Sequence, residues 1–554
     1  MHYRRLLAPQ FLSNTAMRFR SPIRSVASAA IVASASLWAV AFNAQAQSVV
    51  KGAVVIPQSS IERPEDVGVR SHTNIMFLGD PRKGKGHQYG GGPGGGYTPA
   101  NIEAYYNLPS TGGSQIVAIV DAFDNPNALS DFNFFSNAFG LPTESSSSVT
   151  ASTNRVFQVV YASGTKPGVD STGGWELEES LDVQWAHAMA PNAKIVLVEA
   201  TTNSNANLYA AEDVATNYVD GNGLRPKEIS NSWGGSESRS ETSSDSHFNH
   251  TGAAYFASAG DSGTPAQYPS SSPYIISAGG TTINSDPAGN FLSETAWSWV
   301  AAEEWGGGGG PSADELRPSF QNAISAIVGT KRGTPDISSC SDPETGVSVY
   351  DTYPYEGTPY TWWIVGGTSA ASPTLAGIAN NAATTQGFFP AGSQALLASI
   401  YYSLGNFNFR DIVAGQNQLY YAGPGWDFCT GVGTPQGIGG FEAVTDVSTS
   451  VEVQHGVFLY SRASTAYTQV LTLTNTGATT INGPISLILG SLTDATLTNA
   501  SGTTSVLTPT GRPYINLAIG SLAPGASTTV GLVFDKTGPT ITFTTDMVAG
   551  SGSR

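Results

Sequence analysis

Between about Tyr97 and Val447 the chain alternates short apolar runs with segments in which apolar residues recur every three or four positions. Continuous apolar runs bounded by turn residues are typical of strands buried on both faces of a parallel sheet. The intervening segments have helical spacing, so we expect a parallel sheet with helices on both faces. The predicted strands are Gln115–Asp121, Ala193–Glu199, Glu228–Trp233, Ala253–Ser258, Tyr274–Ala278 and Trp362–Val365, and the predicted helices are Ser130–Phe139, Trp175–Ala190 and Ala370–Ala382.

The sequence pattern changes after Val447, where polar and apolar residues alternate and helical spacing is absent. Val470–Thr474 and Thr528–Phe534 have the period of half-buried strands, and turn residues follow at Asn475–Gly477 and Pro524–Gly525. This pattern predicts that residues 448–554 form an all-β, immunoglobulin-like sandwich. Its role stays open between a passive spacer and a surface or polysaccharide binder.

The N-terminus has the features of an export signal. Residues 1–46 contain five arginines and no acidic residue, and an apolar run of 17 residues, Val26–Phe42, precedes Ala44-Gln45-Ala46. This order predicts a signal peptide cleaved after Ala46. The alternative is a membrane anchor, but the run is shorter than the ~20 residues of a span. We therefore expect a secreted or periplasmic protein.

We expect a short N-terminal segment between the signal and the α/β domain. It covers residues 47–96 and ends in Gly90–Gly96, a composition typical of a flexible linker. The predicted domains are thus residues 1–46, 47–96, 97–447 and 448–554.

Composition narrows the class of protein. The 554 residues are 40% hydrophobic and 10% aromatic, as in a folded globular chain, but only 12% are charged and the formal charge is −17. An acidic chain is a poor partner for nucleic acid. In an exported protein the two cysteines, Cys340 and Cys429, favour a disulfide slightly over two buried thiols.

A candidate nucleophile lies where a predicted strand turns into a helix. The segment Gly366-Gly-Thr-Ser369 is rich in glycine and opens the predicted helix Ala370–Ala382. A helix N-terminus offers free N–H groups and a positive field, which suit a serine nucleophile and its oxyanion hole. The alternative interpretation is an ordinary serine cap of a helix.

A serine nucleophile needs a base, and none of the seven histidines lies in a strand-end or glycine-rich context. Glu178 and Asp182 are four positions apart and share one helix face, whereas His187 falls on the opposite face. Two adjacent carboxyls share a proton and titrate as a pair. The alternative is a solvated acidic helix face, because Glu176 and Glu179 are adjacent.

A third carboxyl lies in a glycine-rich turn after a predicted strand. Asp261 follows Ala253–Ser258, at the sheet edge where α/β sites form. A protonated carboxyl there donates to a developing oxyanion. The alternative is simple turn formation by Asp-Ser-Gly.

Together these motifs resemble the sedolisins, the serine-carboxyl peptidases of family S53. The resemblance runs from about Tyr97 to Val447. It rests on Glu178-x-x-x-Asp182, Ser-Ala-Gly-Asp261-Ser-Gly and Gly-Thr-Ser369-x-x-x-Pro373, on Trp185-Ala-His-Ala-Met-Ala-Pro191 and Ser232-Trp-Gly234, and on Ala422-Gly-Pro-Gly-Trp-Asp427.

The resemblance implies a subtilisin-like α/β fold and a secreted, acid-acting endopeptidase. It implies that Ser369 is the nucleophile, Glu178 its general base, and Asp182 the group that orients Glu178. Asp261 would join the Ser369 N–H in the oxyanion hole. The strand Ser232-Trp233-Gly234 would pair with an extended peptide substrate.

The resemblance also implies one Ca²⁺ ion. Its ligands would be the carboxylates of two aspartates and three backbone carbonyls, an all-oxygen set that calcium prefers. The five residues are Asp411, Ile412, Gly423, Gly425 and Asp427. Sedolisins usually carry a long prodomain, for which residues 47–96 are too short.

Rival functions stay open on the sequence alone. The main alternative is a catalytically silent peptide- or surface-binding protein on the same scaffold, and another is a neutral, histidine-dependent subtilase. The expected partners are protein or peptide substrates of a monomer, without nucleic acid and without a membrane once the signal is removed. Side-chain preference, and endopeptidase against tripeptidyl-peptidase action, are not readable from the motifs.

Overall fold

The computed structural model describes residues 49–51, 54–79, 91–286, 288–298, 305–387, 389–405, 408–442, 444–462, 465–504, 507, 509–536, 540–550 and 554. The predicted signal peptide, residues 1–46, lies outside the described residues. Among the helices that the structure describes, none combines the length and the apolar character needed to cross a bilayer.

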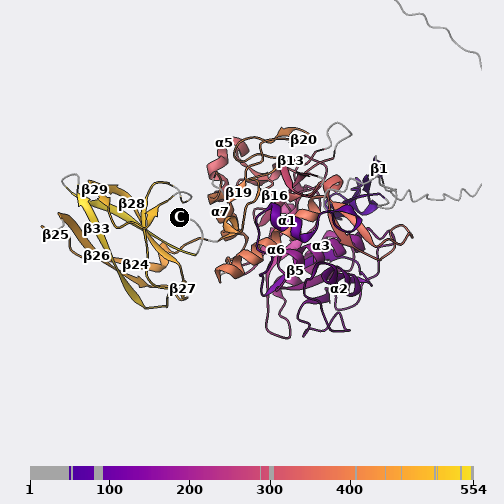
Figure 1. Ribbon diagram of the computed structural model, residues 1–554, viewed down its shortest axis with the longest axis horizontal. Helices are drawn as coiled ribbons and strands as arrows, with labels where there is room; N and C mark the ends of the chain where they lie inside the picture. Colours follow the sequence, from indigo (N-terminus) through magenta and orange to yellow (C-terminus); the bar gives the residue numbers. More distant parts are fainter. Residues whose placement is uncertain are drawn as a thin grey trace, which may run out of the picture. The chain divides into compact units, whose positions relative to one another are not determined.

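A mostly parallel sheet of eight strands forms the centre of the α/β domain (Figure 1). Its order is β13-β12-β10-β8-β5-β7-β6, with β16 paired to β12. Every pair is parallel except β12 with β13. The strands are β5 (Ile116–Ala122), β6 (Phe157–Tyr161), β7 (Lys194–Ala200), β8 (Pro226–Asn231), β10 (Ala254–Ser258), β12 (Ile275–Ser285), β13 (Phe291–Ala296) and β16 (Ile337–Cys340).

Helices cover both faces of this sheet because its strands are apolar on both sides. On β5, Val117 and Ile119 belong to one core with α3 and α6, whereas Ala118 and Val120 belong to a second core with α4. The predicted α/β architecture is confirmed. The main helices are α2 (Ala128–Phe139), α3 (Gly174–Met189), α4 (Asn205–Asn217), α6 (Thr368–Gln386) and α7 (Ser393–Tyr402).

The N-terminal segment is part of a second sheet rather than a separate piece. β2 (Val54–Ile56) and β4 (Met76–Leu78) pair with each other, and β4 also pairs with β18 (Trp362–Gly366). The sheet order is β1-β2-β4-β18-β17, where β1 is Val49–Lys51 and β17 is Val347–Tyr350. Because β18 leads directly into α6, this segment lies next to the candidate nucleophile.

The structure differs from the expected flexible linker at Gly92–Gly96. These residues form a tight turn, in which the Gly92 N–H donates to the Gly96 carbonyl and the Ser348 hydroxyl donates to the Pro93 carbonyl. A Cβ atom on Gly96 would lie 2.7 Å from the backbone nitrogen of Ser348. Glycine here permits close packing on β17 instead of flexibility.

The C-terminal region consists of strands, as predicted. Two five-stranded sheets share one core, which includes Leu473 and Leu532 of one sheet and Leu487 and Met547 of the other, as in a β-sandwich. The longer strands are β24 (Val451–His455), β26 (Ala466–Asn475), β28 (Ile485–Thr493), β33 (Ser527–Lys536) and β34 (Thr542–Ala549).

The expected disulfide is wrong. Cys340 and Cys429 are both buried and free. Their thiols point to different backbone partners, Cys340 to the Thr345 carbonyl and Cys429 to the Tyr420 carbonyl. Burial raises the pKa of the Cys429 thiol to about 12, so it stays protonated and unreactive.

Candidate active site

Helix α3 carries the paired carboxyls into the interior. Glu178 and Asp182 are both fully buried, and so is the rest of this helix. The alternative of a solvated acidic helix face is therefore wrong. The Ser232 hydroxyl donates to Asp182 Oδ1 over 2.9 Å. No described residue makes a hydrogen bond of standard geometry to either carboxyl oxygen of Glu178.

Ser369 lies in the first turn of α6, after Gly367 at a φ of +92°. Its hydroxyl donates to the Ser232 carbonyl over 3.3 Å. The same hydroxyl is near enough to Glu178 to lower the pKa of that carboxyl. The structure thus brings Ser369, Glu178 and Asp182 to one place, although the Ser369 hydroxyl now points to a backbone carbonyl.

Burial controls the titration of the paired carboxyls. Burial raises the pKa of Glu178 well above its usual range, and the charges of Asp182 and Asp121 raise it further. Burial also raises the pKa of Asp182, while the Ser232 hydroxyl opposes that rise. The pair therefore keeps a proton to higher pH than two solvated carboxyls do.

Asp261 lies in the turn that follows β10, against the start of α6. Its Oδ1 accepts hydrogen bonds from the Thr368 N–H at 2.7 Å and the Thr368 hydroxyl at 2.9 Å. Its Oδ2 is buried and has no hydrogen-bond partner among the described residues. Burial raises the pKa of Asp261 to about 8. Below that pH the carboxyl carries a proton that Oδ2 can donate.

A carbonyl of the chain itself occupies the expected oxyanion hole. The Ser369 N–H donates to the Asn74 carbonyl over 3.0 Å. A Cβ atom built on Gly367 would lie 2.1 Å from that carbonyl oxygen and 2.6 Å from Asp261 Oδ2. The expectation of a free Ser369 N–H is thus corrected, because this N–H already donates to the Asn74 carbonyl. Gly367 leaves the space for this approach.

The strand expected to bind substrate also has an internal partner. β3 (His72–Thr73) pairs antiparallel with β9 (Trp233–Ser236), and His72 lies opposite Gly234 and Thr73 opposite Trp233. The Ser232 carbonyl accepts the Asn74 N–H over 3.3 Å. β11 (Gln267–Tyr268) pairs with the other edge of β9. Residues 72–74 therefore lie along β9 in an extended form.

Two site residues were missed by the sequence argument. Asn74 belongs to no motif, and nothing in its local sequence indicates its position. Asp121 is the next-to-last residue of β5, is fully buried, and has no hydrogen-bond partner among the described residues. Its charge raises the pKa of Glu178. An acid at the end of a buried central strand was the available signal for Asp121.

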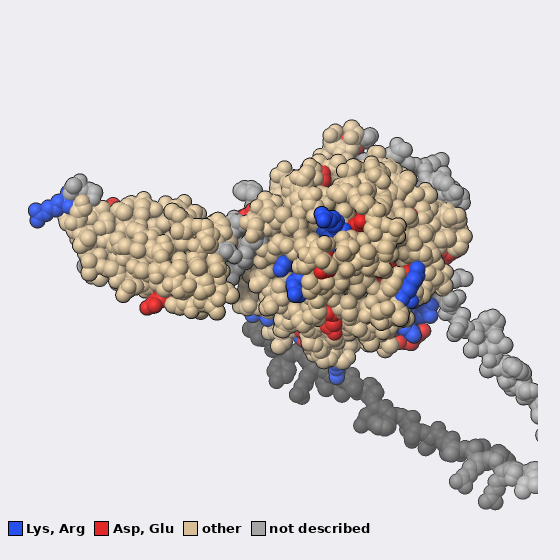
Figure 2. Space-filling view, turned by 90° about the horizontal axis from the view of Figure 1, so that it is seen from below, with Lys and Arg blue, Asp and Glu red and all other residues tan. Residues whose placement is uncertain are grey.

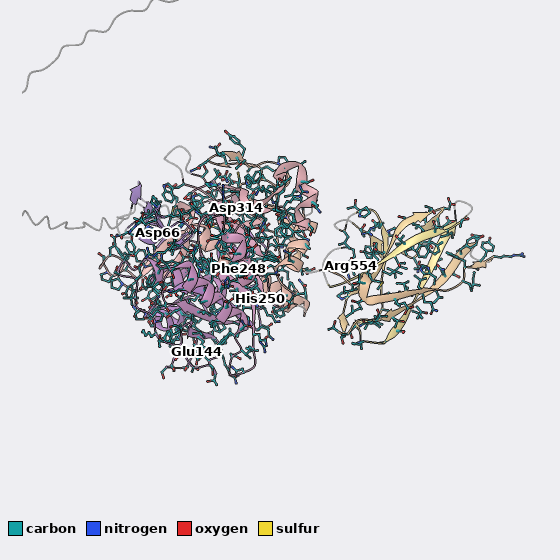
Figure 3. The ribbon with its side chains drawn as sticks, turned by 180° about the vertical axis from the view of Figure 1, so that it is seen from behind. Asp66, Glu144, Phe248, His250, Asp314 and Arg554 are labelled. Carbon is teal, nitrogen blue, oxygen red and sulfur yellow. The ribbon has the colours of Figure 1, made fainter. Side chains whose placement is uncertain are left out.

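No hydrogen bond joins Ser369 to a histidine of the described chain. His187 is buried beside Phe132, and its Nε2 lies 2.9 Å from the Pro142 carbonyl. Burial lowers the pKa of His187 to about 4. His250 is exposed, in the segment that precedes β10 together with Phe248 (Figure 3). His72 lies on β3, with its Nδ1 3.0 Å from the Thr73 carbonyl.

The candidate calcium residues meet at one turn. The Gly423 N–H donates to Asp427 Oδ2 and the Gly425 N–H donates to Asp411 Oδ2, each over 2.9 Å. Both carboxylates thus accept backbone N–H groups of residues 423–425, and Asp427 Oδ1 also accepts from the N–H groups of Cys429 and Thr430. Ile412 follows Asp411 and is buried. No group of three or more His, Cys, Asp or Glu side chains suited to a metal occurs among the described residues. A cation here would need the carbonyls of Gly423 and Gly425, and the oxygen donors present fit Ca²⁺.

Known proteins of similar sequence are serine-carboxyl peptidases by name or belong with them. Kumamolisin of Bacillus sp. (strain MN-32) is 31% identical over 372 residues, which are 62% of this chain and 62% of the relative. Sedolisin of Pseudomonas sp. (strain 101) is 27% identical over 372 residues, which are 61% of this chain and 60% of the relative. The chain therefore spans about three fifths of the length of these relatives. No family model matches the chain.

A solved structure shares the fold. It is Pseudomonas sedolisin, a serine-carboxyl proteinase complexed with two molecules of pseudo-iodotyrostatin, with a TM-score of 0.50 and 26% identity. The match covers 62% of this chain and 95% of that chain. The α/β domain thus has the subtilisin-like fold of the serine-carboxyl peptidases. In sequence and in fold the chain is similar to the sedolisins.

The buried carboxyls give the fold a definite pH dependence. Burial raises the pKa of Glu176 and Glu199 to about 9 each and that of Glu228 to about 8. Above their ordinary value of 4.5 the unfolded chain releases protons that the folded chain keeps, so the free energy of unfolding falls as pH rises. We expect the urea midpoint to be highest below pH 4.5 and to fall steadily toward pH 9.

Glu228→Gln provides the check on this prediction. The amide remains neutral at every pH and keeps an oxygen for the Asn380 side chain, which donates to Glu228 Oε2 over 2.6 Å. The variant should therefore lose less stability than the wild type between pH 5 and 8. The upper end of this range is the Glu228 pKa of about 8. A wild-type midpoint that rises over this range contradicts the prediction.

Proposed function

We propose that this chain is a serine-carboxyl endopeptidase that hydrolyses peptide bonds in acidic surroundings. One observation carries the proposal. A peptide carbonyl, that of Asn74, lies against the Ser369 N–H and next to Asp261 Oδ2, in a strand that pairs with β9. The carboxyls of Glu178 and Asp182 lie beside the same serine. This is the arrangement that acyl transfer needs.

The chemistry begins at Ser369. Its Oγ attacks the substrate carbonyl carbon while Glu178, which is ionised when the single proton of the Glu178–Asp182 pair lies on Asp182, takes the hydroxyl proton. Glu178 then gives this proton to the leaving amine, and water hydrolyses the acyl-enzyme with Glu178 again as base. Asp182 orients Glu178 and shares its charge, and Ser232 holds Asp182 by the 2.9 Å hydrogen bond.

The oxyanion is stabilised by the Ser369 N–H and by protonated Asp261. The two Thr368 donors fix Oδ1 of Asp261, so the proton resides on Oδ2, which faces the carbonyl. An ionised Asp261 cannot donate and repels the developing negative charge. The activity therefore belongs to pH values below the Asp261 pKa of about 8.

Three further proposals follow from the sequence. Asp411, Ile412, Gly423, Gly425 and Asp427 bind one Ca²⁺, which ties the glycine turn to Asp411 and has a structural role. The predicted signal peptide directs the chain out of the cytoplasm. After export the chain acts as a monomer on protein or peptide substrates. On the face shown in Figure 2, charged side chains are few and scattered.

A peptide- or surface-binding protein without catalysis is the second candidate function.

The triad is tested by cleavage of an unfolded protein at acidic pH. Ser369→Ala removes the nucleophile, and we expect cleavage to be lost. Glu178→Gln removes the base, and we expect a loss of about 10²–10⁴-fold in kcat. Both rates are measured by the release of new amino termini.

Glu179→Gln is the matched control, because Glu179 lies on the same helix, is equally buried and makes no hydrogen bond to Ser369 or to any other described residue through its carboxyl oxygens. It should retain cleavage within about tenfold of the wild type. Cleavage by Ser369→Ala overturns the nucleophile. If Glu178→Gln retains cleavage and His72→Gln loses it, the enzyme is histidine-dependent. Absence of cleavage by the wild type at every pH supports the binding protein.

Asp261→Asn separates hydrogen-bond donation from titration. The amide keeps one acceptor for Thr368 and one donor for the oxyanion, and it does not ionise. We expect the activity of this variant, divided by that of the wild type, to rise between pH 6 and 9, because only the wild type loses a proton at about pH 8. Asp261→Ala should lower kcat by about 10²–10³-fold at all pH values. If the activity of Asp261→Asn divided by that of the wild type stays constant over this pH range, Asp261 is not the titrating donor.

Calcium binding is tested by thermal unfolding. A chelator should lower the Tm of the wild type, and added Ca²⁺ should restore it, since a ligand that binds only the folded state stabilises it. Asp427→Asn and Asp411→Asn should lower the Tm and abolish the response to Ca²⁺. Asp446→Asn, at an exposed aspartate outside the turn, is the control. A Tm that does not respond to calcium in the wild type contradicts the site.

A further inference from the structure

The Asn74 side chain lies in a small polar pocket at the end of β10. Asn74 is 1% exposed, and its Nδ2 donates to Ser258 Oγ over 2.7 Å. Ser258 is fully buried, and it is the last residue of β10, three positions before Asp261. The same residue therefore places its carbonyl in the oxyanion hole and its amide group against Ser258.

A second acceptor borders the pocket. Gln267 Oε1 is buried and has no hydrogen-bond partner among the described residues. A Cβ atom on Gly234 would lie 3.4 Å from this oxygen and 3.7 Å from Asn74 Nδ2. A Cβ atom on Gly260 would lie 2.7 Å from the same Gln267 oxygen. Two glycines thus leave room for Gln267 near the Asn74 amide, whose own Oδ1 is buried and, like Gln267 Oε1, has no hydrogen-bond partner among the described residues.

The position of Asn74 matches that of a substrate residue. Its carbonyl occupies the place of the carbonyl that Ser369 attacks, and residues 72 and 73 before it pair with β9. We infer that the pocket formed by Ser258 and Gln267 selects an amide side chain, asparagine above all, on the residue whose carbonyl is attacked. Asn74 is held there as an internal, substrate-like occupant. This inference rests on the proposed peptidase function.

The chemistry of the pocket explains the selection. The Asn74 amide donates one N–H to Ser258 in a place closed to water, and Gln267 Oε1, at the border of the same pocket, is an acceptor left unpaired among the described residues. A leucine of similar size leaves the Ser258 hydroxyl without its hydrogen bond to the amide, and such a loss exceeds that from a missing methylene. Aspartate offers at most one donor, when protonated. A glutamine side chain is one methylene longer than the one that the pocket now holds.

Peptide cleavage by the full-length wild-type chain tests the inference. The peptides are identical except at the residue before the cut, which is Asn, Gln, Asp or Leu. We expect kcat/KM to be at least about tenfold higher for Asn than for Leu. Ser258→Ala should reduce this ratio to less than about threefold. Ser136→Ala is the control, because Ser136 is a buried serine on α2 whose hydroxyl has no partner among the described residues.

Hydrogen exchange supplies a readout that does not need catalysis. In Asn74→Leu the backbone amides of residues 72–74 should exchange at least about tenfold faster than in the wild type, because the side chain no longer bonds to Ser258. Ser258→Ala should have the same effect in an otherwise wild-type chain. Ser136→Ala should leave this exchange unchanged.

The two measurements separate the inference from the proposed function. Cleavage with no preference for Asn over Leu, or with Leu preferred, overturns the pocket and leaves the peptidase intact. Absence of cleavage at every pH, both by the wild type and by Asn74→Leu, in which residues 72–74 are expected to leave the site more readily, overturns the peptidase. Exchange that is unchanged in both Asn74→Leu and Ser258→Ala overturns the selective contact whether or not peptides are cleaved.

Discussion

Helix α3 places acidic side chains in the interior, away from water and from compensating cations. Glu178 and Asp182 are fully buried there, and Asp121 approaches them from the end of β5. Ionising several carboxyls at such a place is costly, so the folded chain keeps protons that solvated carboxyls release. The same burial that sets the pH range of the chemistry also ties the stability of the fold to acidic conditions.

Asp261 shows how the surroundings give one carboxyl a distinct role. Thr368 fixes one oxygen with two hydrogen bonds, and burial keeps the other oxygen protonated up to a pKa of about 8. Thr368 and Ser369 are adjacent at the start of α6. The turn from β18 into α6 therefore positions the Ser369 hydroxyl, the Ser369 N–H and the Thr368 donors to Asp261 together. Gly367 makes this possible because a side chain there would fill the space next to Asp261.

The N-terminal segment changes how the site is understood. β2 and β4 extend the sheet that contains β18, and the residues just before β4 run along β9. Asn74 is therefore held on both sides by regular pairing, in the place where a substrate residue would lie. A segment expected to be a short extension and linker thus contributes residues to the candidate active site.

Local patterns in the sequence determined much of this protein. Apolar runs predicted the buried parallel strands, the four-residue spacing of Glu178 and Asp182 placed them on one helix face, and glycine marked the turn before Ser369. Each is a property of neighbouring residues. Only the tertiary structure decided that α3 is buried, that the two cysteines stay apart, and that Asn74 meets Ser369. Those outcomes depend on contacts between residues far apart in the chain, and local spacing does not encode the geometry of such contacts.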